Sequence, residues 1–576
     1  FQDSDIAKWL EGAAYSLIWH PDERLERMAD EAIEDIVAAQ QPDGYLDTYY
    51  IINGPERRWT NLMDHHELYC AGHMLEAALA YEQATGKRRL LDAMIKYVDL
   101  IDATFGTRPG KKRGYPGHPV LEMALMRLYA RTGEPRHLAL AKYFVDQRGQ
   151  TPLYFQEERL REKNPYMWED SPFGDQYYQA GKPLREQTEA EGHAVRAMYL
   201  YCGMTDVARE TGDKALVETC RVLWRNVVRR RMYVTGAVGS SAYGESFTFD
   251  YDLPNDTAYA ETCAAIGLVF WARRMLTLEP RGEYADVMER ALYNGVISGM
   301  QQDGKRFFYV NPLEVLPEAC ARDHGRRHVK PERQKWFACA CCPPNLIRTL
   351  TSLERYVYSA DDTAWYVHLY VAGGAAAAFG GVKASLKVET GYPWREEVSI
   401  RVKPEAPVRF RLALRMPQWC AQPELRLNGE ACPAEHRDGY AYIDREWRPG
   451  DTVALRLPMP VRVLRANPRV REDAGRVCVA RGPMVYCLEE ADNGGDLHLV
   501  RLNGNRDFTA RFEPDTLGGV VTLASGGIRE DPEGWDEGRL YAPCGEPATK
   551  PVRLRWIPYY AWANRAVGEM LVWVRA

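Results

Sequence analysis

The chain has 576 residues, more than one hydrophobic core usually holds, so two to four domains are expected. A formal net charge of −6 without a long basic run argues against a nucleic-acid partner, and no apolar run reaches the roughly 18–20 residues of a membrane span. Most of the 13 cysteines are scattered, which is typical of free or metal-bound thiols in a reducing compartment, so we expect a cytoplasmic protein.

Up to about residue 358 the sequence pattern is helical. Apolar residues recur at three- and four-residue spacing between Gly, Pro and Asp turns, and strand patterns are nearly absent. A series of helical hairpins in a domain of this size predicts a toroid of about six helix pairs; a helical solenoid would give the same local pattern, but no clear repeat supports it. About eleven helices are predicted, at 5–20, 22–40, 61–85, 87–105, 119–132, 135–148, 188–203, 206–232, 257–279, 284–299 and 346–358.

Three histidines lie on helices that would line the inner ring of a toroid. His73 follows His66 by two helical turns, and His118 and His193 each have a carboxylate nearby in sequence. A single helical histidine is usually a structural residue, but three of them with nearby carboxylates favour a polar pocket. Tyr309, in a run of aromatic residues, is a further candidate, and its simpler interpretation is an ordinary core aromatic.

A long Gly-rich loop is predicted at 236–256, and it is acidic and aromatic. Loops of this length in compact domains are more often functional than not. Glu245 lies in this loop within the run Gly-Glu-Ser-Phe. Taken alone, Glu245 would more commonly be a solvated carboxylate than an acid catalyst.

Glu261 and Cys263 follow near the start of the helix predicted from residue 257. Residues two apart do not share a helix face, so they could bind one ion only at an irregular first turn or at the helix end. Together with Cys341 and Cys342 they would supply one carboxylate and three thiolates, a sulfur-rich set that points to zinc. The simpler alternative is a glutamate favoured by the helix dipole beside a core cysteine.

The run Cys-Ala-Cys-Cys-Pro-Pro-Asn at 339–345 concentrates three cysteines within four positions. Adjacent cysteines such as Cys341 and Cys342 rarely bridge each other, so they are either packed thiols or metal-bound thiolates. Two prolines stiffen the turn that follows, and Asn345 is predicted to cap the next helix. A buried, inert cysteine cluster remains an equally good interpretation of this stretch alone.

The hydrophobic period changes to two near residue 363. Alternating runs at 386–389, 398–402, 408–414 and 453–457, separated by turn signals, predict an antiparallel β-sandwich. A second all-β segment follows from about residue 461, with strands expected at 475–480, 483–488, 520–523, 552–557 and 569–574.

In combination these motifs resemble glycoside hydrolase family 127, whose best-known members are bacterial β-L-arabinofuranosidases. The joint occurrence of Glu-Thr-Cys and Cys-Cys-Pro-Pro-Asn is highly specific, and the resemblance runs through the whole chain. It is carried by FQDSDIAKWL at 1–10, GESF at 244–247, DLPN at 252–255, ETC at 261–263, CACCPPN at 339–345, RGPMVY at 481–486 and WIPYY at 556–560.

The resemblance implies an (α/α)6 barrel at 1–360, a β-sandwich domain at 361–460 and a second β-sandwich domain at 461–576. Family members often begin some tens of residues earlier, so N-terminal residues are expected to be missing here. The family's nucleophile matches Cys341 and its general acid/base matches Glu245. Its zinc ligands match Glu261, Cys263, Cys341 and Cys342, and its sugar-contacting residues match His73, His118, His193 and Tyr309.

The implied activity is retaining exo-hydrolysis of terminal β-L-arabinofuranose. The expected partner is a small-molecule or oligosaccharide substrate that ends in this sugar, and a homodimeric assembly is also considered. Three alternatives stay open. The enzyme could act on another pectic pentose; it could be a sugar epimerase or lyase in which His73 and His193 move protons and zinc is structural; or the β-domains could be sugar-binding modules on a non-catalytic scaffold.

Overall fold

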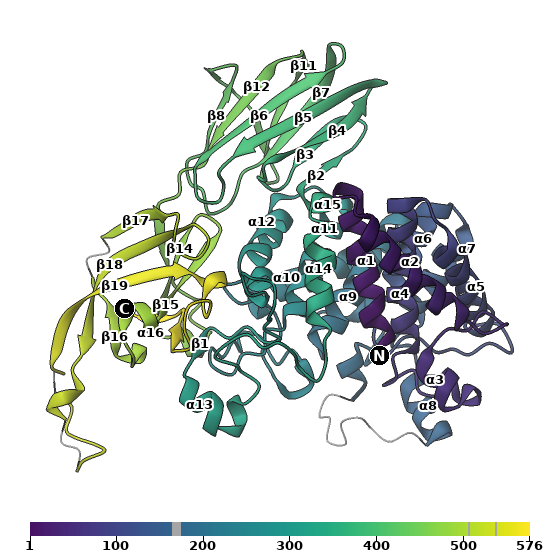
Figure 1. Ribbon diagram of the computed structural model, residues 1–576, viewed down its shortest axis with the longest axis horizontal. Helices are drawn as coiled ribbons and strands as arrows, with labels where there is room; N and C mark the ends of the chain where they lie inside the picture. Colours follow the sequence, from purple (N-terminus) through teal and green to yellow (C-terminus); the bar gives the residue numbers. More distant parts are fainter. Residues whose placement is uncertain (164–173, 505–506, 536–537, 546) are drawn as a thin grey trace.

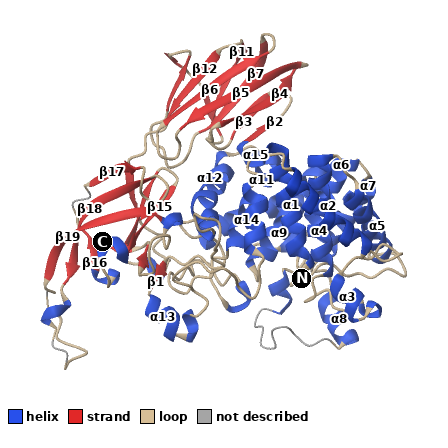
Figure 2. Cartoon of the chain, viewed as in Figure 1, coloured by secondary structure: helices blue, strands red, loops and turns tan. Residues whose placement is uncertain are grey.

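The computed structural model describes residues 1–163, 174–504, 507–535, 538–545 and 547–576 (Figure 1). The helices form one body, and the strands form two separate groups beside it (Figure 2). The chain therefore combines a helical domain with two β-rich domains, as the sequence predicts.

Six helices form the inner ring of the helical domain. Each contacts its ring neighbours, and the last one returns to the first, so the ring closes. Closure distinguishes a barrel from an open solenoid. The inner helices are α1 (Asp3–Trp19), α4 (Glu67–Thr85), α6 (Leu121–Thr132), α9 (Ala194–Thr211), α11 (Thr262–Leu278) and α14 (Cys342–Leu350).

Outer helices pack against this ring, and most of them directly follow the inner helix that they cover. Their apolar residues face inward and their charged residues face solvent, which is the pattern of an amphipathic helix. Within the described residues they are α2 (Glu23–Ala38), α5 (Arg89–Thr104), α7 (Pro135–Gln147), α10 (Lys214–Asn226) and α12 (Gly282–Arg290). Shorter helices lie in the connections: α3 (Thr48–Asn53), α8 (Tyr154–Glu162), α13 (Pro317–Arg322) and α15 (Glu354–Val357).

One predicted helix break is wrong. A helix is predicted to end at Gly203 and the next to begin at residue 206, but α9 runs through both positions to Thr211. It ends at Gly212, whose φ of 65° is the left-handed conformation that glycine adopts easily. Gly203 is a packing residue, because a Cβ there would lie 2.6 Å from Cβ of Glu122 on α6.

Several inner helices begin at a different residue from the predicted one. The helices predicted from 61, 188 and 257 start at Glu67, Ala194 and Thr262, and the helix predicted from 346 starts at Cys342. Pro343 and Pro344 lie in the first turn of α14, where a missing N–H costs nothing. Asn345 is therefore inside the helix and is not its cap. These shifts matter because they decide which residues lie at the helix ends.

The middle domain is a sandwich of two sheets. Stacked aromatic residues join them, with the rings of Phe379 and Phe410 4.3 Å apart. All strand pairs are antiparallel except β3 with β7. One sheet contains β2 (Tyr358–Ala360), β3 (Ala364–Val367), β7 (Val408–Arg415), β10 (Glu435–Arg437) and β11 (Tyr440–Trp447). The other contains β4 (Gly373–Phe379), β5 (Val382–Thr390), β6 (Glu397–Pro404), β8 (Glu424–Leu427), β9 (Glu430–Ala431) and β12 (Asp451–Arg456).

The last domain differs from the expected pair of separate antiparallel sheets. Its strands form one ten-stranded sheet whose pairings return on themselves through β15, β19, β18, β16, β21 and β14. The closure arises because β15 pairs with β14 through a tight hairpin and also with β19. β16 and β21 pair in parallel. The short helix α16 (Glu490–Asn493) follows β15.

The strands of this sheet come from the C-terminal segment with one exception. That exception is the short strand β1, which lies in the helical domain's part of the sequence and pairs with β20. The strands are β1 (Glu314–Val315), β13 (Val461–Leu464), β14 (Arg476–Arg481), β15 (Met484–Glu489), β16 (Val500–Leu502), β17 (Phe508–Glu513), β18 (Val520–Glu530), β19 (Thr549–Pro558), β20 (Met570–Leu571) and β21 (Val574–Arg575).

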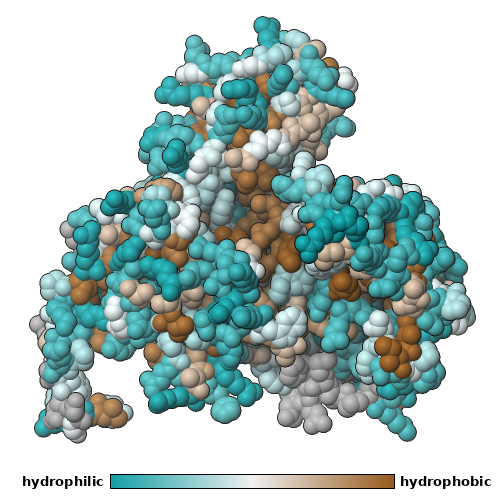
Figure 3. Space-filling view, in the orientation of Figure 1, coloured by the Kyte–Doolittle hydropathy of each residue, from teal (hydrophilic) through white to brown (hydrophobic). Residues whose placement is uncertain are grey.

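Buried ion pairs and apolar contacts join the domains. Arg415 of the middle domain is fully buried and donates to Asp286 of the barrel at 2.6 Å and to Glu289. Hydrophobic residues gather in the crevice where the three domains meet (Figure 3). Since breaking a buried charge pair is costly, the domains are held in a fixed arrangement.

Candidate active site and metal centre

The candidate site lies at the N-terminal end of the inner ring. Four of its residues are the N-cap residues of inner helices: His66 of α4, His193 of α9, Glu261 of α11 and Cys341 of α14. They line one cavity of about 400 Å³. Helix N-termini carry partial positive charge, so this end of the barrel favours thiolates, carboxylates and other anions.

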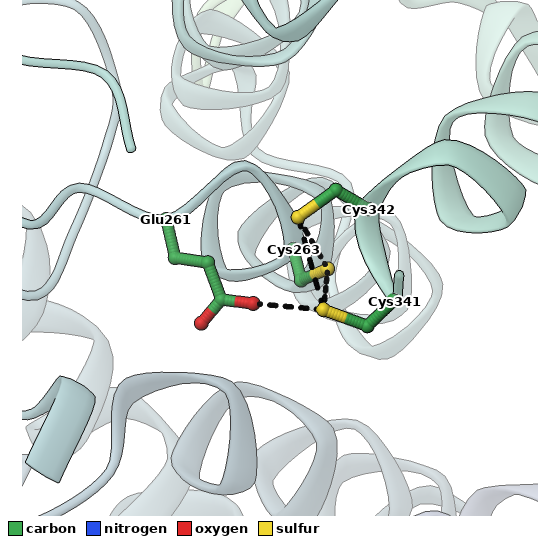
Figure 4. Close-up of side chains that lie close together, drawn as sticks. All are labelled: Glu261, Cys263, Cys341 and Cys342. Carbon is green, nitrogen blue, oxygen red and sulfur yellow. Dashed lines mark hydrogen bonds between the residues drawn. The ribbon is translucent and has the colours of Figure 1, made fainter. Parts of the chain in front are cut away.

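Glu261, Cys263, Cys341 and Cys342 form a buried cluster, with their potential ligand atoms all within 4.8 Å of one another (Figure 4). Sγ of Cys263 lies 3.4 Å from Sγ of Cys341 and 3.5 Å from Sγ of Cys342. Sγ of Cys341 lies 3.7 Å from Sγ of Cys342 and 3.5 Å from Oε1 of Glu261. Helices α11 and α14 thus bring the four predicted ligands together at their N-terminal ends.

The charges of this cluster fit a bound cation. Burial and the charge of Cys341 raise the pKa of Glu261 well above its usual range. Burial opposes ionisation of Cys263, but hydrogen bonds from Cys341 and Cys342 bring its pKa down to about 7. Oε2 of Glu261 is buried without a hydrogen-bond partner among the described residues. Four acidic groups cannot all ionise at such close range without a counter-charge, and a metal ion would supply it.

Glu245 is presented by a strained loop. Its φ is +53°, a left-handed conformation that is uncommon for a residue with a side chain, and Gly244 before it has a φ of 65°. A Cβ on Gly244 would lie 2.8 Å from the ring of Tyr177, so the turn needs glycine. An antiparallel bridge between His193 and Ser246 then fixes the loop to the N-terminus of α9. Backbone geometry therefore aims the Glu245 side chain at the cavity.

Two donors hold the carboxylate of Glu245. Nδ1 of His193 accepts the backbone N–H of Val195 at 3.2 Å, so Nε2 carries the ring proton and donates to Oε2 of Glu245 at 2.8 Å. The hydroxyl of Tyr259 donates to Oε1 at 2.7 Å. Burial alone would raise the pKa of Glu245, but these hydrogen bonds and the charge of Arg196 hold it below its usual range.

Tyr309 connects the loop to the cysteine cluster. Its hydroxyl lies 3.4 Å from Oε1 of Glu245 and 3.3 Å from Sγ of Cys341. Its carbonyl accepts the N–H of Thr262, and Val310 bridges Glu261, so the segment runs beside the start of α11. A carboxylate and a thiol thus both lie within 3.4 Å of the same hydroxyl.

Of the three predicted histidines, two line the cavity and one does not. His118 and His193 line the cavity, with ring centres 5.6 Å apart. His73 does not line it, and its ring lies 4.5 Å from that of Tyr69, with no hydrogen-bond partner for either nitrogen among the described residues. Seven residues along a helix correspond to about 10 Å, so His73 lies that far below the N-terminus of α4. Its assignment as a sugar contact stays a prediction.

Several residues that line the cavity are not among the site residues predicted from the sequence. His66 lies at the N-terminus of α4 and is the histidine of that helix that lines the cavity. Arg196 also lies there, as does Trp336, whose side chain is largely exposed. Tyr259 does not line the cavity but reaches the site through its hydrogen bond to Glu245. For His66 a signal existed: the other site residues cluster just before inner helices, and His66 precedes the apolar run of α4.

The sequence matches family models of known enzymes over all three domains. The helical barrel is a glycoside hydrolase catalytic domain: residues 1–355 match the model described as beta-L-arabinofuranosidase, GH127 catalytic domain. Residues 364–459 match the GH127 middle domain and residues 461–575 the family 127 C-terminal domain. The chain therefore belongs to glycoside hydrolase family 127.

Individual relatives are similar over the whole chain. A non-reducing end beta-L-arabinofuranosidase from Bifidobacterium longum subsp. longum is 44% identical over 592 residues, covering 100% of this chain and 89% of the relative. The crystal structure of a GH127 beta-L-arabinofuranosidase from Geobacillus stearothermophilus T6 is 54% identical with a TM-score of 0.97, covering 100% and 90%. A further GH127 beta-arabinofuranosidase structure is 38% identical with a TM-score of 0.89, covering 100% and 88%.

None of the helices among the described residues combines the length and apolar character needed to cross a membrane.

Proposed function

We propose that the protein is a retaining exo-glycoside hydrolase that releases terminal β-L-arabinofuranose, with Cys341 as nucleophile and Glu245 as general acid/base. The observation that carries the proposal is the position of these two groups. Both line one cavity, and a single hydroxyl, that of Tyr309, lies within 3.4 Å of each. A retaining mechanism needs a nucleophile and an acid/base this close, on either side of one anomeric carbon. The identity of the sugar, β-L-arabinofuranose, is inferred from the names of the relatives.

We further propose that the cluster of Glu261, Cys263, Cys341 and Cys342 holds zinc. Tetrahedral zinc with bonds of about 2.3 Å to sulfur and about 2.0 Å to oxygen separates its ligands by roughly 3.8 Å (sulfur to sulfur) and 3.5 Å (sulfur to oxygen). The sulfur–sulfur distances of 3.4, 3.5 and 3.7 Å and the sulfur–oxygen distance of 3.5 Å come close to these values. When bound, zinc would keep the cysteine sulfurs ionised at neutral pH.

The chemistry then follows in two steps. In the first, Sγ of Cys341 attacks C1 of the arabinofuranosyl group, the bond from C1 to the leaving oxygen breaks, and Glu245 gives that oxygen a proton. In the second, the Glu245 carboxylate takes a proton from water, the water oxygen attacks C1, and the bond from carbon to sulfur breaks. Two displacements at C1 retain its configuration.

The first step requires a protonated Glu245, but its pKa lies below the usual range in the free site. The acid form is therefore a minor population at neutral pH, and the rate of the first step should fall as the pH rises. The ionised form is the one that the second step needs as base. His193 and Tyr259 donate to the carboxylate and so favour this second role.

The size of the cavity supports action on a chain end. About 400 Å³ lies at the low end of the range for small-molecule sites and suits one sugar with part of its leaving group. The alternative of an epimerase or lyase that uses His73 and His193 finds less support, because His73 lies outside the cavity lining.

Trapping of the covalent intermediate tests the proposal. Glu245→Gln should slow hydrolysis by roughly 10²–10⁴-fold, and less in the first step for an aryl arabinofuranoside whose leaving group needs little protonation. The thioglycosyl enzyme should then accumulate, and mass spectrometry should find one pentose on a peptide that contains Cys341. The wild-type product should retain its anomeric configuration.

Cys341→Ser is the matched control and should carry no label. Zinc must be measured in both variants, because loss of the metal alone could inactivate Cys341→Ser. A label on Glu261 or another carboxylate, or inversion of configuration, would exclude the cysteine nucleophile. Early release of mid-sized fragments from a polymeric arabinan would exclude exo-action.

A further inference from the structure

A second cavity, of about 410 Å³, opens at the opposite end of the barrel axis from the candidate active site. All six inner helices contribute to its lining, α9, α11 and α14 from their C-terminal halves, and it extends to α15 and the start of β2. These two elements lie where the barrel meets the middle domain (Figure 1). Its lining is rich in arginine: Arg127, Arg209, Arg273, Arg274, Arg348 and Arg355. None of these residues takes part in the chemistry proposed above.

The acidic residues of this cavity are already paired. Glu11 lies 2.9 Å from Arg348 and 3.4 Å from Arg127, which also contacts Glu76. The remaining acid of the lining, Asp206, binds Arg274 at 2.6 Å. Three carboxylates therefore neutralise three of the six guanidinium groups.

Arg273 and Arg355 are left without an acidic partner within 4 Å among the described residues. Arg273 uses Nε to donate to the carbonyl of Arg355 at 2.6 Å, but its Nη1 is buried without any hydrogen-bond partner in the described part of the chain. Within the described ranges Arg355 bonds only to neutral groups, the hydroxyl of Tyr15 and the side chain of Gln83. Burial lowers the pKa of Arg273, as expected for a cation without a counter-charge.

The helix ends do not supply the missing partner. The C-terminal carbonyl groups of helices attract arginine, and that of Arg355 in α15 already accepts Nε of Arg273, while Arg274 donates to the carbonyl of Phe270 in the middle of α11 at 3.2 Å. These bonds still leave Nη1 of Arg273 unsatisfied, and a buried unsatisfied donor costs about 1–3 kcal/mol. An occupant that brings oxygen acceptors and negative charge would remove this cost.

We propose that this cavity binds a small organic anion whose phosphate or carboxylate group is held by Arg273 and Arg355. Guanidinium groups bind both kinds of oxyanion through paired hydrogen bonds. The body of the ligand would lie along Met123, Met126 and Phe270, which supply the apolar part of the lining. A cavity of this volume accommodates a monosaccharide-sized molecule, so a sugar phosphate or a sugar acid fits both features.

The test is calorimetric titration of the full-length, metal-loaded protein in a chloride buffer of low ionic strength. The probes are ribose 5-phosphate and galacturonate, each with its neutral counterpart, ribose and galactose, and inorganic phosphate. We expect binding of at least one sugar anion and not of its neutral counterpart. The probe that binds more tightly shows whether the natural ligand is a sugar phosphate or a sugar acid.

Two variants locate the site. Arg273→Gln and Arg355→Gln should each weaken binding about ten-fold or more, because a hydrogen bond to a charged group is lost in each. Neither change leaves a carboxylate unpaired, so both proteins should fold, and retained arabinofuranosidase activity would verify this. Arg409→Gln, which removes an exposed arginine of the middle domain, should bind as the wild type does.

Three outcomes would overturn the proposal. One is no binding of either sugar anion. A second is equal affinity in the wild type and both cavity variants. The third is binding of inorganic phosphate alone, which would mean an adventitious ion only. Because the probes are not substrates of the hydrolysis, failure here leaves the proposed activity untouched, and failure of that activity leaves this site untouched.

Discussion

Tyr259→Phe should move the pH dependence of hydrolysis without removing any group that reacts. The Tyr259 hydroxyl donates to Oε1 of Glu245 at 2.7 Å, and it stabilises the ionised carboxylate more than the neutral acid. A hydrogen bond to a charged group is worth about 1.5–3 kcal/mol. At about 1.4 kcal/mol per pKa unit, its loss should raise the pKa of Glu245 by roughly one to two units.

The direction of the effect follows from the role of Glu245. A higher pKa keeps Glu245 protonated to a higher pH, so the basic limb of kcat/KM should shift upward by roughly one to two pH units. The assay is kcat/KM against pH for an arabinofuranoside with a poor leaving group, since its first step depends on the proton from Glu245. An activated aryl substrate should show a smaller shift.

A tyrosine in the same loop provides the control. Tyr251 packs against Arg469, with the guanidinium 5.3 Å from the ring centre, so Tyr251→Phe should leave the profile unchanged. If Tyr259→Phe folds, keeps its metal and shows a basic limb at the wild-type pH, then Glu245 is not the group that this limb reports. A downward shift would contradict the sign of the argument.

Three further outcomes are expected. Gly244→Ala places a methyl group against the ring of Tyr177 and forces alanine into a left-handed φ, which costs about 1–2 kcal/mol. We expect kcat to fall more than ten-fold while the circular dichroism spectrum stays that of the wild type. An unchanged kcat would refute this. Arg415→Met leaves Asp286 and Glu289 buried without a counter-charge. Urea denaturation should therefore show a loss of about 3–5 kcal/mol in the free energy of unfolding. A loss below about 1 kcal/mol would be inconsistent with the buried pairing. Dialysis against a chelator should abolish activity and lower the melting temperature, and added zinc should restore both; full activity without metal would rule out the proposed centre.

The sequence predicts the domains better than the helix ends, and the site depends on the helix ends. Hydrophobic periodicity reports which face of a helix is buried, but not the turn at which the helix begins. Periodicity places His66 and His73 on one face of α4, but it does not show that His66 is the one at the N-terminus of the helix, beside the cavity. The choice of Asn345 as a cap failed for the same reason, because prolines are tolerated in a first turn and allow α14 to start at Cys342.

Other features depend on contacts between distant residues. The left-handed conformation of Glu245 is fixed by a bridge to His193 and by the ring of Tyr177, and neither is adjacent in sequence. The closed sheet of the last domain arises from long-range pairing that alternation within single strands does not encode. In contrast, the sequence makes the cluster of Glu261 and the cysteines a candidate through two close pairs of rare residue types, at 261/263 and 341/342, and the family resemblance favours the metal-binding interpretation over packed thiols.

The stretch of chain that carries Tyr309 also contacts the last domain. Just after Tyr309, the carbonyl of Pro312 accepts the Tyr559 hydroxyl at 2.9 Å, and that of Leu313 accepts the N–H of Val572 at 2.9 Å. The stretch then continues into β1 of the closed sheet. A protein cut after the middle domain would keep every proposed catalytic and metal-binding residue but lose the anchor that positions Tyr309. The three domains should therefore be inherited as one unit. Recombination that exchanged the last domain for a foreign module would disturb catalysis, even though none of the described residues that line the cavity belongs to that domain.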